Sequence, residues 1–172
     1  DRHGDDFDYM CEEVEVVVQE GEDTGLDLSD ADKVYTFYAQ ASGDSLSNSA
    51  SLDPPLQLRG LEWRTVQHFI LAARFLDSAP EIADQIRQCE TAEEARAKSL
   101  GSDEARAQEG WNDDSRVSVT GEAMYAKFGL AEASVEDAQT QAVRQALLDT
   151  GDRTIALVDP DPWAGLQALG GV

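Results

Sequence analysis

Two aspartates near the end of the chain could take part in the cleavage of a glycosidic bond. Asp159 and Asp161 flank Pro160 in a segment whose composition predicts a rigid turn. Glycoside hydrolases use a pair of carboxylates, one as the acid and the other as the base or the nucleophile. In a chain as acidic as this one, two solvated surface acids are the simpler interpretation. Asp159 and Asp161 are therefore retained only as candidate catalytic residues.

Gln67 and Arg74 lie seven positions apart in a segment with helical periodicity, so the spacing places them on one helix face. An amide near a guanidinium offers hydrogen bonds to a phosphate or to a heterocycle. The alternative is a solvated helix face, which the spacing alone favours.

His68 follows Gln67 and is the only histidine within the predicted domain. A catalytic triad requires a nucleophile and an orienting acid close to the histidine in space. Serines occur nearby in the sequence, but none stands in a G-x-S-x-G motif. We therefore expect His68 to be a partly buried histidine with a satisfied hydrogen bond.

Trp111 and Trp163 stand in segments that read as loops. A tryptophan in a loop can stack on a base or a sugar. Packing of the indole beneath the loop is an equally good interpretation for either residue.

The composition excludes several classes of protein. The chain has 172 residues, of which 41% are hydrophobic, enough for one domain with a buried core. Its 35 acidic and 13 basic residues give a formal charge of −22, and so acidic a surface repels the phosphates of a nucleic acid. No apolar run approaches the ~20 residues of a membrane span. The opening residues carry no apolar signal-peptide region either.

Metal and cofactor motifs are not found in the sequence. Cys11 and Cys89 can form one disulfide or none, and neither stands in a C-x-x-C motif or a Cys/His cluster. The sequence contains no G-x-G-x-x-G and no P-loop motif. We therefore predict no metal site and no cofactor.

The distribution of charge and periodicity predicts residues 1–32 to be an acidic N-terminal arm or linker and residues 33–172 to be the domain. The expected strands are 34–39, 56–58, 61–63 and 154–158, with a further short strand at 15–19 in the arm. The expected helices are 66–76, a segment from 80 to about 86, 92–100, 117–128 and 134–149. A capping box at Thr91 should open the third helix, and Gly101 should close it in the left-handed conformation. Strands and helices do not alternate, which favours a predominantly helical α+β domain with a small sheet.

Several segments resemble the NADAR family, also called YbiA-like, from Tyr35 to Gly165. Their order and spacing follow the family's order and spacing. The matching segments are the aromatic strand 35–38, Ser47-Asn48 with a Ser-Asn-Phe loop, 65–69 with a T-[VS]-E-H-[YF] helix, 72–77 with the K-F-x-D that follows it, 92–101 in part with an A-x-x-L-G-R helix, Trp111 with a lone Trp, 126–128 with A-K-F, 147–152 with L-L-x-T-G-D, and Trp163 and Gly165 with W-G-x-G.

The resemblance implies a YbiA-like fold and cleavage of N-glycosidic bonds without a metal. The family's substrates include riboflavin-pathway intermediates and ADP-ribose attached to nucleobases. The chain would then hold a pocket for a ribose phosphate that carries a base. The resemblance implies that the ligand-binding residues are Asn48, Gln67, Arg74, Trp111 and Trp163.

This sequence departs from the family pattern at the charged positions. Gln67 replaces the Glu of the E-H pair, and an amide cannot ionise or transfer a proton. Arg74 replaces the family Lys, Ser102 the Arg after L-G, and Leu157 the acid expected near the end of the final strand. Loss of one preorganised charge typically costs orders of magnitude in rate.

We therefore predict a divergent NADAR-like domain that is catalytically weak or inactive and serves as a structural or interaction module of a larger protein or a viral assembly. One alternative is an active N-glycosidase that acts on ADP-ribosyl or other N-riboside substrates through Asp159 or Asp161. The other is a nucleotide binder that holds ADP-ribose without hydrolysis. The expected partners are an ADP-ribose-like ligand or neighbouring protein chains, and the expected location is intracellular or within an assembly.

Overall fold

The computed structural model describes residues 27–102, 106–130 and 137–159. The predicted strand at 15–19, Cys11, Asp161 and Trp163 lie outside the described residues. In chain order the elements are β1 (Val34–Tyr38), β2 (Leu56–Leu58), β3 (Leu61–Trp63), α1 (Val66–Ala73), α2 (Pro80–Arg87), α3 (Ala92–Leu100), α4 (Asp113–Lys127), α5 (Ala138–Leu148) and β4 (Thr154–Val158). Five helices with a few short strands confirm the predicted helix-rich α+β fold.

The strands form two separate pairs. β1 and β4 are parallel, with Val34 opposite Thr154 and Tyr38 opposite Val158. β2 and β3 form an antiparallel hairpin. Its two-residue turn places Arg59 at φ 52° and Gly60 at φ 76°, the left-handed conformation that tight hairpin turns require.

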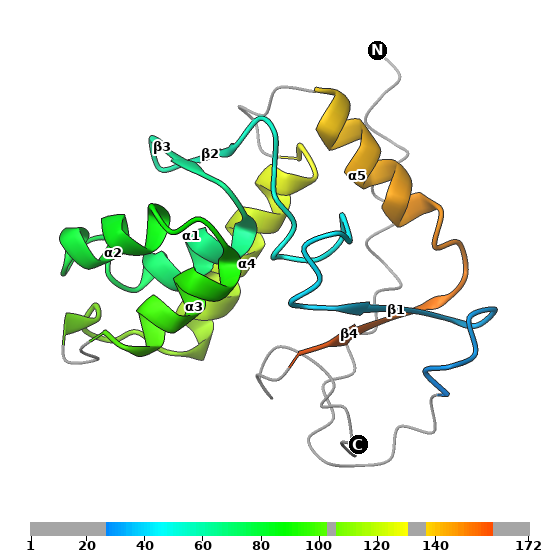
Figure 1. Ribbon diagram of the computed structural model, residues 1–172, viewed down its shortest axis with the longest axis horizontal. Coiled ribbons are helices and arrows are strands. Elements are labelled where there is room, and N and C mark those ends of the chain that lie inside the picture. Colours follow the sequence, from blue (N-terminus) through cyan, green and yellow to red (C-terminus); the bar gives the residue numbers. More distant parts are fainter. Residues whose placement is uncertain (1–26, 103–105, 131–136, 160–172) are drawn as a thin grey trace.

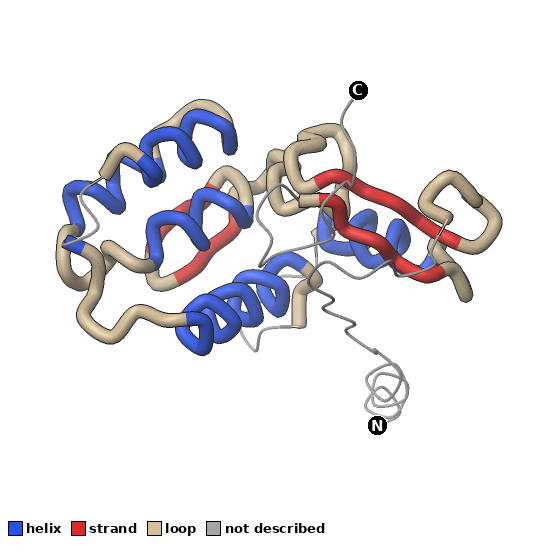
Figure 2. Tube along the Cα trace, turned by 90° about the horizontal axis from the view of Figure 1, so that it is seen from below, coloured by secondary structure: helices blue, strands red, loops and turns tan. Residues whose placement is uncertain are grey.

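The helices and the parallel pair occupy different sides of the molecule. Helices α1 to α4 gather with the β2–β3 hairpin on one side, and β1 and β4 lie with α5 on the other (Figure 1). The view from below shows the same division (Figure 2). The long loop that joins β1 to β2 runs between the two sides (Figure 1). This loop is therefore placed to contact both.

α1 is the central helix of the core. Its apolar face, with Val66 and Phe69 almost fully buried, packs against α2, α3 and α4. Trp63 at the end of β3 packs edge-to-face on Phe69, with ring centroids 5.3 Å apart. The predicted amphipathic stripe is thus confirmed, but α1 ends at Ala73, and Leu76 lies in the turn that follows.

The ends of three helices differ from those predicted. Thr91 caps α3 as expected, but the Glu94 carboxylate accepts from the backbone of Glu90 rather than from that of Thr91. Gly101 keeps a right-handed φ of −80°, because its N–H completes helical bonds to Ala97 and Ser99.

Helix α4 begins at Asp113, four residues before the predicted start at 117. Asn112 caps the helix there, because its side chain accepts from the Ser115 N–H. Asp137 likewise caps α5, which begins at Ala138.

Within the described ranges, no helix combines the length and the apolar composition that a membrane crossing requires.

Candidate functional site

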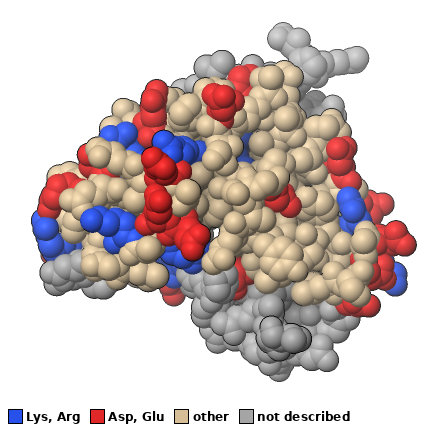
Figure 3. Space-filling model, viewed as in Figure 1, with Lys and Arg blue, Asp and Glu red and all other residues tan. Residues whose placement is uncertain are grey.

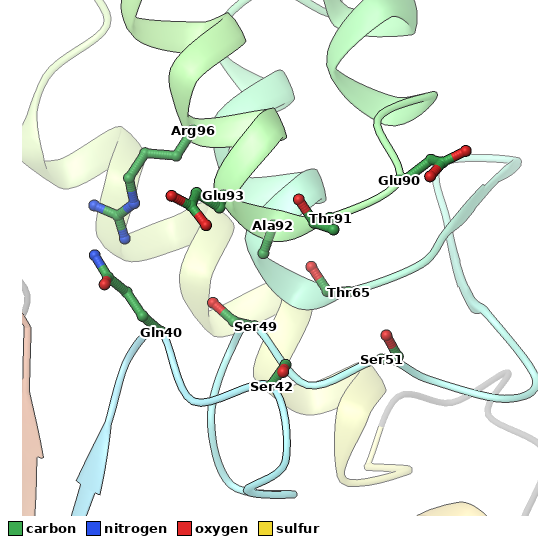
Figure 4. A pocket seen from close by; sticks show the side chains of 10 residues that line it. All are labelled: Gln40, Ser42, Ser49, Ser51, Thr65, Glu90, Thr91, Ala92, Glu93 and Arg96. Carbon is green, nitrogen blue, oxygen red and sulfur yellow. The ribbon is translucent and has the colours of Figure 1, made fainter.

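A cavity of about 370 Å³ opens where the parallel strands meet α3. Parallel strands end at the same edge of a sheet, so the residues that follow β1 and β4 lie side by side. Gln40 follows β1 and Asp159 follows β4 at this edge. The cavity is lined by Gln40, Ser42, Ser49, Ser51, Thr65, Glu90, Thr91, Ala92, Glu93 and Arg96 (Figure 4).

Hydroxyl groups dominate the lining. Five of the ten lining residues are serines or threonines, and they come from the β1–β2 loop and from the residues that cap α1 and α3. The first turn of α3 faces the loop across this cavity (Figure 4). Such a wall can hydrogen-bond a polyhydroxylated ligand at several points.

Arg96 is the one basic residue among the ten that line the cavity. Its side chain and that of Gln40 point toward one another (Figure 4). The guanidinium also lies 3.8 Å from the carboxylate of Asp159, whose side chain is nearly buried. The pair joins α3 to the segment after β4, so Arg96 is held at the cavity wall by a residue distant in the sequence.

The acidic lining residues are more exposed than Arg96. Glu93 lies beside Arg96, whereas the carboxylate of Glu90 is directed away from the other lining side chains (Figure 4). Acidic and basic side chains alternate over the helical half of the molecule on the face shown in Figure 3. Two acidic residues and one basic residue line the cavity.

His68 joins α1 to the segment before α3. Its Nε2 lies 3.2 Å from the carbonyl of Cys89, which can only accept, so Nε2 carries the proton. The Nδ1 lies 2.7 Å from the hydroxyl of Thr65 and accepts from it. These two contacts confirm the predicted histidine with satisfied hydrogen bonds, although its side chain is fully rather than partly buried. It fixes Thr65, a lining residue, in place.

We expect acid to destabilise the protein partly through His68. Burial lowers the pKa of His68 below its usual 6.5, so the unfolded chain takes up a proton at a higher pH than the folded protein. The stability that depends on neutral His68 is complete above pH 6.5 and is lost as the pH falls through the folded-state pKa. Urea unfolding of the parent and of His68→Gln at pH 7 and pH 5 measures this. The parent should lose more stability than the variant, and equal losses would contradict the assignment.

Lys127, the last residue of α4, forms hydrogen bonds to the β1–β2 loop. Its side chain is 3% exposed, and its Nζ donates to the carbonyls of Leu46 and Ser47 at 3.0 and 2.9 Å. Burial lowers the pKa of this ammonium to about 8, although the nearby Asp44 acts in the opposite direction. A cation in so little solvent persists only because its hydrogen bonds are satisfied.

A sequence model of the NADAR domain matches residues 29–162 of the chain. The chain belongs to the NADAR family. The NMR structure of the Escherichia coli protein YbiA is similar to this NADAR domain, with a TM-score of 0.50 and 23% sequence identity over 74% of this chain and 67% of YbiA. The likeness to YbiA shows that the fold is shared. A comparison with curated proteins gave no match.

The NADAR domain brings two of the predicted ligand-binding residues to the border of the cavity. The backbone N–H of Gln67 donates to the carbonyl of Asn48 at 2.9 Å, which ties the β1–β2 loop to the first turn of α1. Their sequence neighbours Ser49 and Thr65 line the cavity, although Asn48 and Gln67 themselves do not. Gln67 is 8% exposed, so any group at this position is largely removed from water.

Arg74 and Trp111 lie elsewhere in the NADAR domain. Arg74 donates to the carbonyl and hydroxyl of Ser99 at 2.9 and 3.0 Å, near the C-terminal end of α3, whereas the cavity lies at the N-terminal end of that helix. Trp111 packs against the hydrophobic core. Gln67 lies at the border of this cavity and Arg74 does not, so the two residues do not contact a common ligand in it. For Trp111 the structure favours the core-packing alternative.

Two lining residues, Arg96 and Gln40, could not be identified from the sequence. Both stand in segments without a recognisable motif for binding, and only the meeting of α3 with the end of β1 gives them a role. The capping box at Thr91 was the one local signal, because it places the start of α3 and hence the turn that carries Arg96.

No cluster of three or more His, Cys, Asp or Glu side chains suited to a metal ion lies within the part of the chain that the structure describes.

Proposed function

We propose that this NADAR domain binds a ribose-containing nucleotide of the ADP-ribose type and cleaves N-glycosidic bonds slowly or not at all. The observation that carries the proposal is the cavity beside α3, whose lining combines five hydroxyl groups with the guanidinium of Arg96 and the amide of Gln40, next to the carboxylate of Glu93. Its volume of about 370 Å³ lies at the lower end of the range for small-molecule sites.

The lining suits the two polar parts of such a ligand. Ribose offers hydroxyls that can donate to and accept from serine and threonine side chains. A pyrophosphate is an anion, and Arg96 can hold it through charge-assisted hydrogen bonds in a fixed geometry. The Gln40 amide opposite Arg96 adds a donor and an acceptor to the same part of the wall.

The same site is poorly equipped for catalysis. Cleavage of an N-glycosidic bond builds positive charge on the sugar, which a fixed carboxylate must stabilise. Gln67 cannot carry that charge. Asp159 is buried close to the cavity, but the Arg96 guanidinium 3.8 Å away offsets its field. Ligand binding without efficient hydrolysis is the outcome that these groups support.

An active N-glycosidase is the second candidate, because Asp159 places a nearly buried carboxylate beside the cavity. A panel of N-ribosides, assayed with the parent and with Asp159→Asn, separates the two functions. Turnover that disappears in Asp159→Asn supports the enzyme, and absence of product in the parent ends this alternative. An interaction module that binds neighbouring protein chains is the function left if neither binding nor turnover is observed.

We expect Arg96→Met to weaken the binding of ADP-ribose at least about tenfold, because a charge-assisted hydrogen bond contributes roughly 1.5–3 kcal/mol. Isothermal titration calorimetry measures the dissociation constant. Arg87→Met is the matched control, since Arg87 pairs with Asp84 on α2 and does not line the cavity. Titrations at two salt concentrations correct for the repulsion between an anionic ligand and a chain of charge −22.

Absence of heat from the parent protein at millimolar ADP-ribose would overturn the proposed function. An equal loss of affinity in Arg96→Met and Arg87→Met would show that Arg96 does not bind the ligand.

A further inference from the structure

A chain of hydrogen bonds leads from α4 to the wall of the cavity without touching the space where a ligand would lie. It begins at the Nζ of Lys127, which donates to the carbonyls of Leu46 and Ser47. Ser47 in turn donates its hydroxyl to the carbonyl of Ala39, 2.8 Å away, at the end of β1. The same hydroxyl accepts from the Ser49 N–H at 3.1 Å. Ser49 is a lining residue, so the chain ends at the cavity.

The loop that Lys127 contacts supplies much of the cavity lining. Gln40, Ser42, Ser49 and Ser51 all belong to it. It is long and folds through successive turns, in which Asp44 donates to Ala41 and Ser47 donates to Asp44, and Leu46 and Ser47 are buried. Buried carbonyls require partners. The Lys127 ammonium donates to those of Leu46 and Ser47, and the Ser47 carbonyl also accepts from the Ala50 N–H at 3.3 Å.

A second set of contacts holds the loop from the other side. The Asn48 carbonyl accepts from the Gln67 N–H of α1, and the Leu52 N–H donates to the carbonyl of Arg64. Asp44, at the start of the loop, accepts from the hydroxyl of Tyr35 at 3.1 Å. Lys127 is thus the contact by which α4 fixes the middle of the loop, between anchors made by β1 and α1.

We propose that Lys127 is a positioning residue: its ammonium holds the serine-bearing wall of the cavity in the conformation that binds ligand. It acts through the carbonyls of Leu46 and Ser47 and does not itself contact the ligand. The inference rests on the proposed function for the identity of the ligand, but the positioning of the loop can be measured without any ligand.

The test compares Lys127→Met with the parent by hydrogen exchange and by calorimetry. Methionine keeps the unbranched stem of lysine as far as the ε position and removes the donors, so amides between residues 44 and 52 should exchange at least about tenfold faster while amides of α1 and α2 keep their protection. The dissociation constant for ADP-ribose should rise at least about tenfold. Ile86→Val is the control, because it loosens the core at α2 without contacting the loop.

The possible outcomes are distinguishable. Unchanged exchange between residues 44 and 52 overturns the positioning role, as does an affinity loss that Ile86→Val reproduces. Faster exchange in this segment, together with no binding of ADP-ribose to the parent, supports the positioning of the loop and overturns the proposed function. If Lys127→Met does not fold, Lys127→Gln replaces it, because its amide keeps one short donor. Intermediate exchange is then expected, and parent-like exchange overturns the proposal.

Discussion

Gln67→Glu is expected to raise the rate of N-riboside hydrolysis at least about a hundredfold over the parent, because one preorganised charge at a reacting centre is typically worth 10²–10³ in rate. The position is where the NADAR pattern carries a Glu in its E-H pair. Gln67 is 8% exposed, and its backbone N–H donates to the carbonyl of Asn48 at the border of the cavity, so the charge of a carboxylate there would be little screened by water.

The rate is measured by the release of free base from an ADP-ribosylated nucleoside. Burial of the new carboxylate will lower the free energy of unfolding. The measured rate is therefore divided by the folded fraction of the variant at each temperature. Gln67→Met is the matched control, since it fills the same space without a charge, and it should leave hydrolysis at the level of the parent. A Gln67→Glu protein that binds ADP-ribose as the parent does, yet shows no gain in rate, would mean that the amide at position 67 does not limit the rate of hydrolysis.

Trp63→Ala is expected to reduce the free energy of unfolding by about 3–5 kcal/mol, the range found when a large buried aromatic side chain is removed. Trp63 is fully buried, packs on Phe69, and donates from Nε1 to the carbonyl of Leu58 at 3.1 Å. Because single domains are stable by only about 5–15 kcal/mol, the variant should be partly unfolded at 37 °C.

Urea denaturation followed by circular dichroism measures this loss. Leu61→Ala, on the same strand but exposed to solvent, should change the free energy of unfolding by less than about 0.5 kcal/mol. A loss below about 1 kcal/mol for Trp63→Ala would show that the core relaxes into the space of the indole. Ligand affinity should fall with the folded fraction, because Trp63 stands two residues before Thr65, which caps α1 and lines the cavity.

The helices and strands are largely local properties of the sequence, and most of them could be predicted. The stripe of Val66 and Phe69 places α1 in the core, and Thr91 marks the start of α3. Errors occurred where two local signals competed. Gly101 can adopt a left-handed turn but does not, because its N–H completes right-handed helical bonds.

The candidate site depends on tertiary contacts more than the fold does. The backbone N–H of Gln67 donates to the carbonyl of Asn48 beside the cavity, and Asp159 is buried close to it. The family resemblance implies that Arg74 binds ligand. In the structure Arg74 donates to Ser99 near the C-terminal end of α3, whereas the cavity lies at the N-terminal end of that helix.

The sequence by itself determined the class of fold, the family, and the replacement of an ionisable group by Gln67, since all three follow from residue types and their local order. Only the tertiary structure decided that Arg96 meets Asp159 and that Lys127 reaches Leu46, 81 residues away. Such contacts depend on the pairing of β1 with β4 and on how α3 and α4 pack against α1. Periodicity and caps describe a chain over a few residues at a time, and they carry no information about which distant segments will share a buried surface.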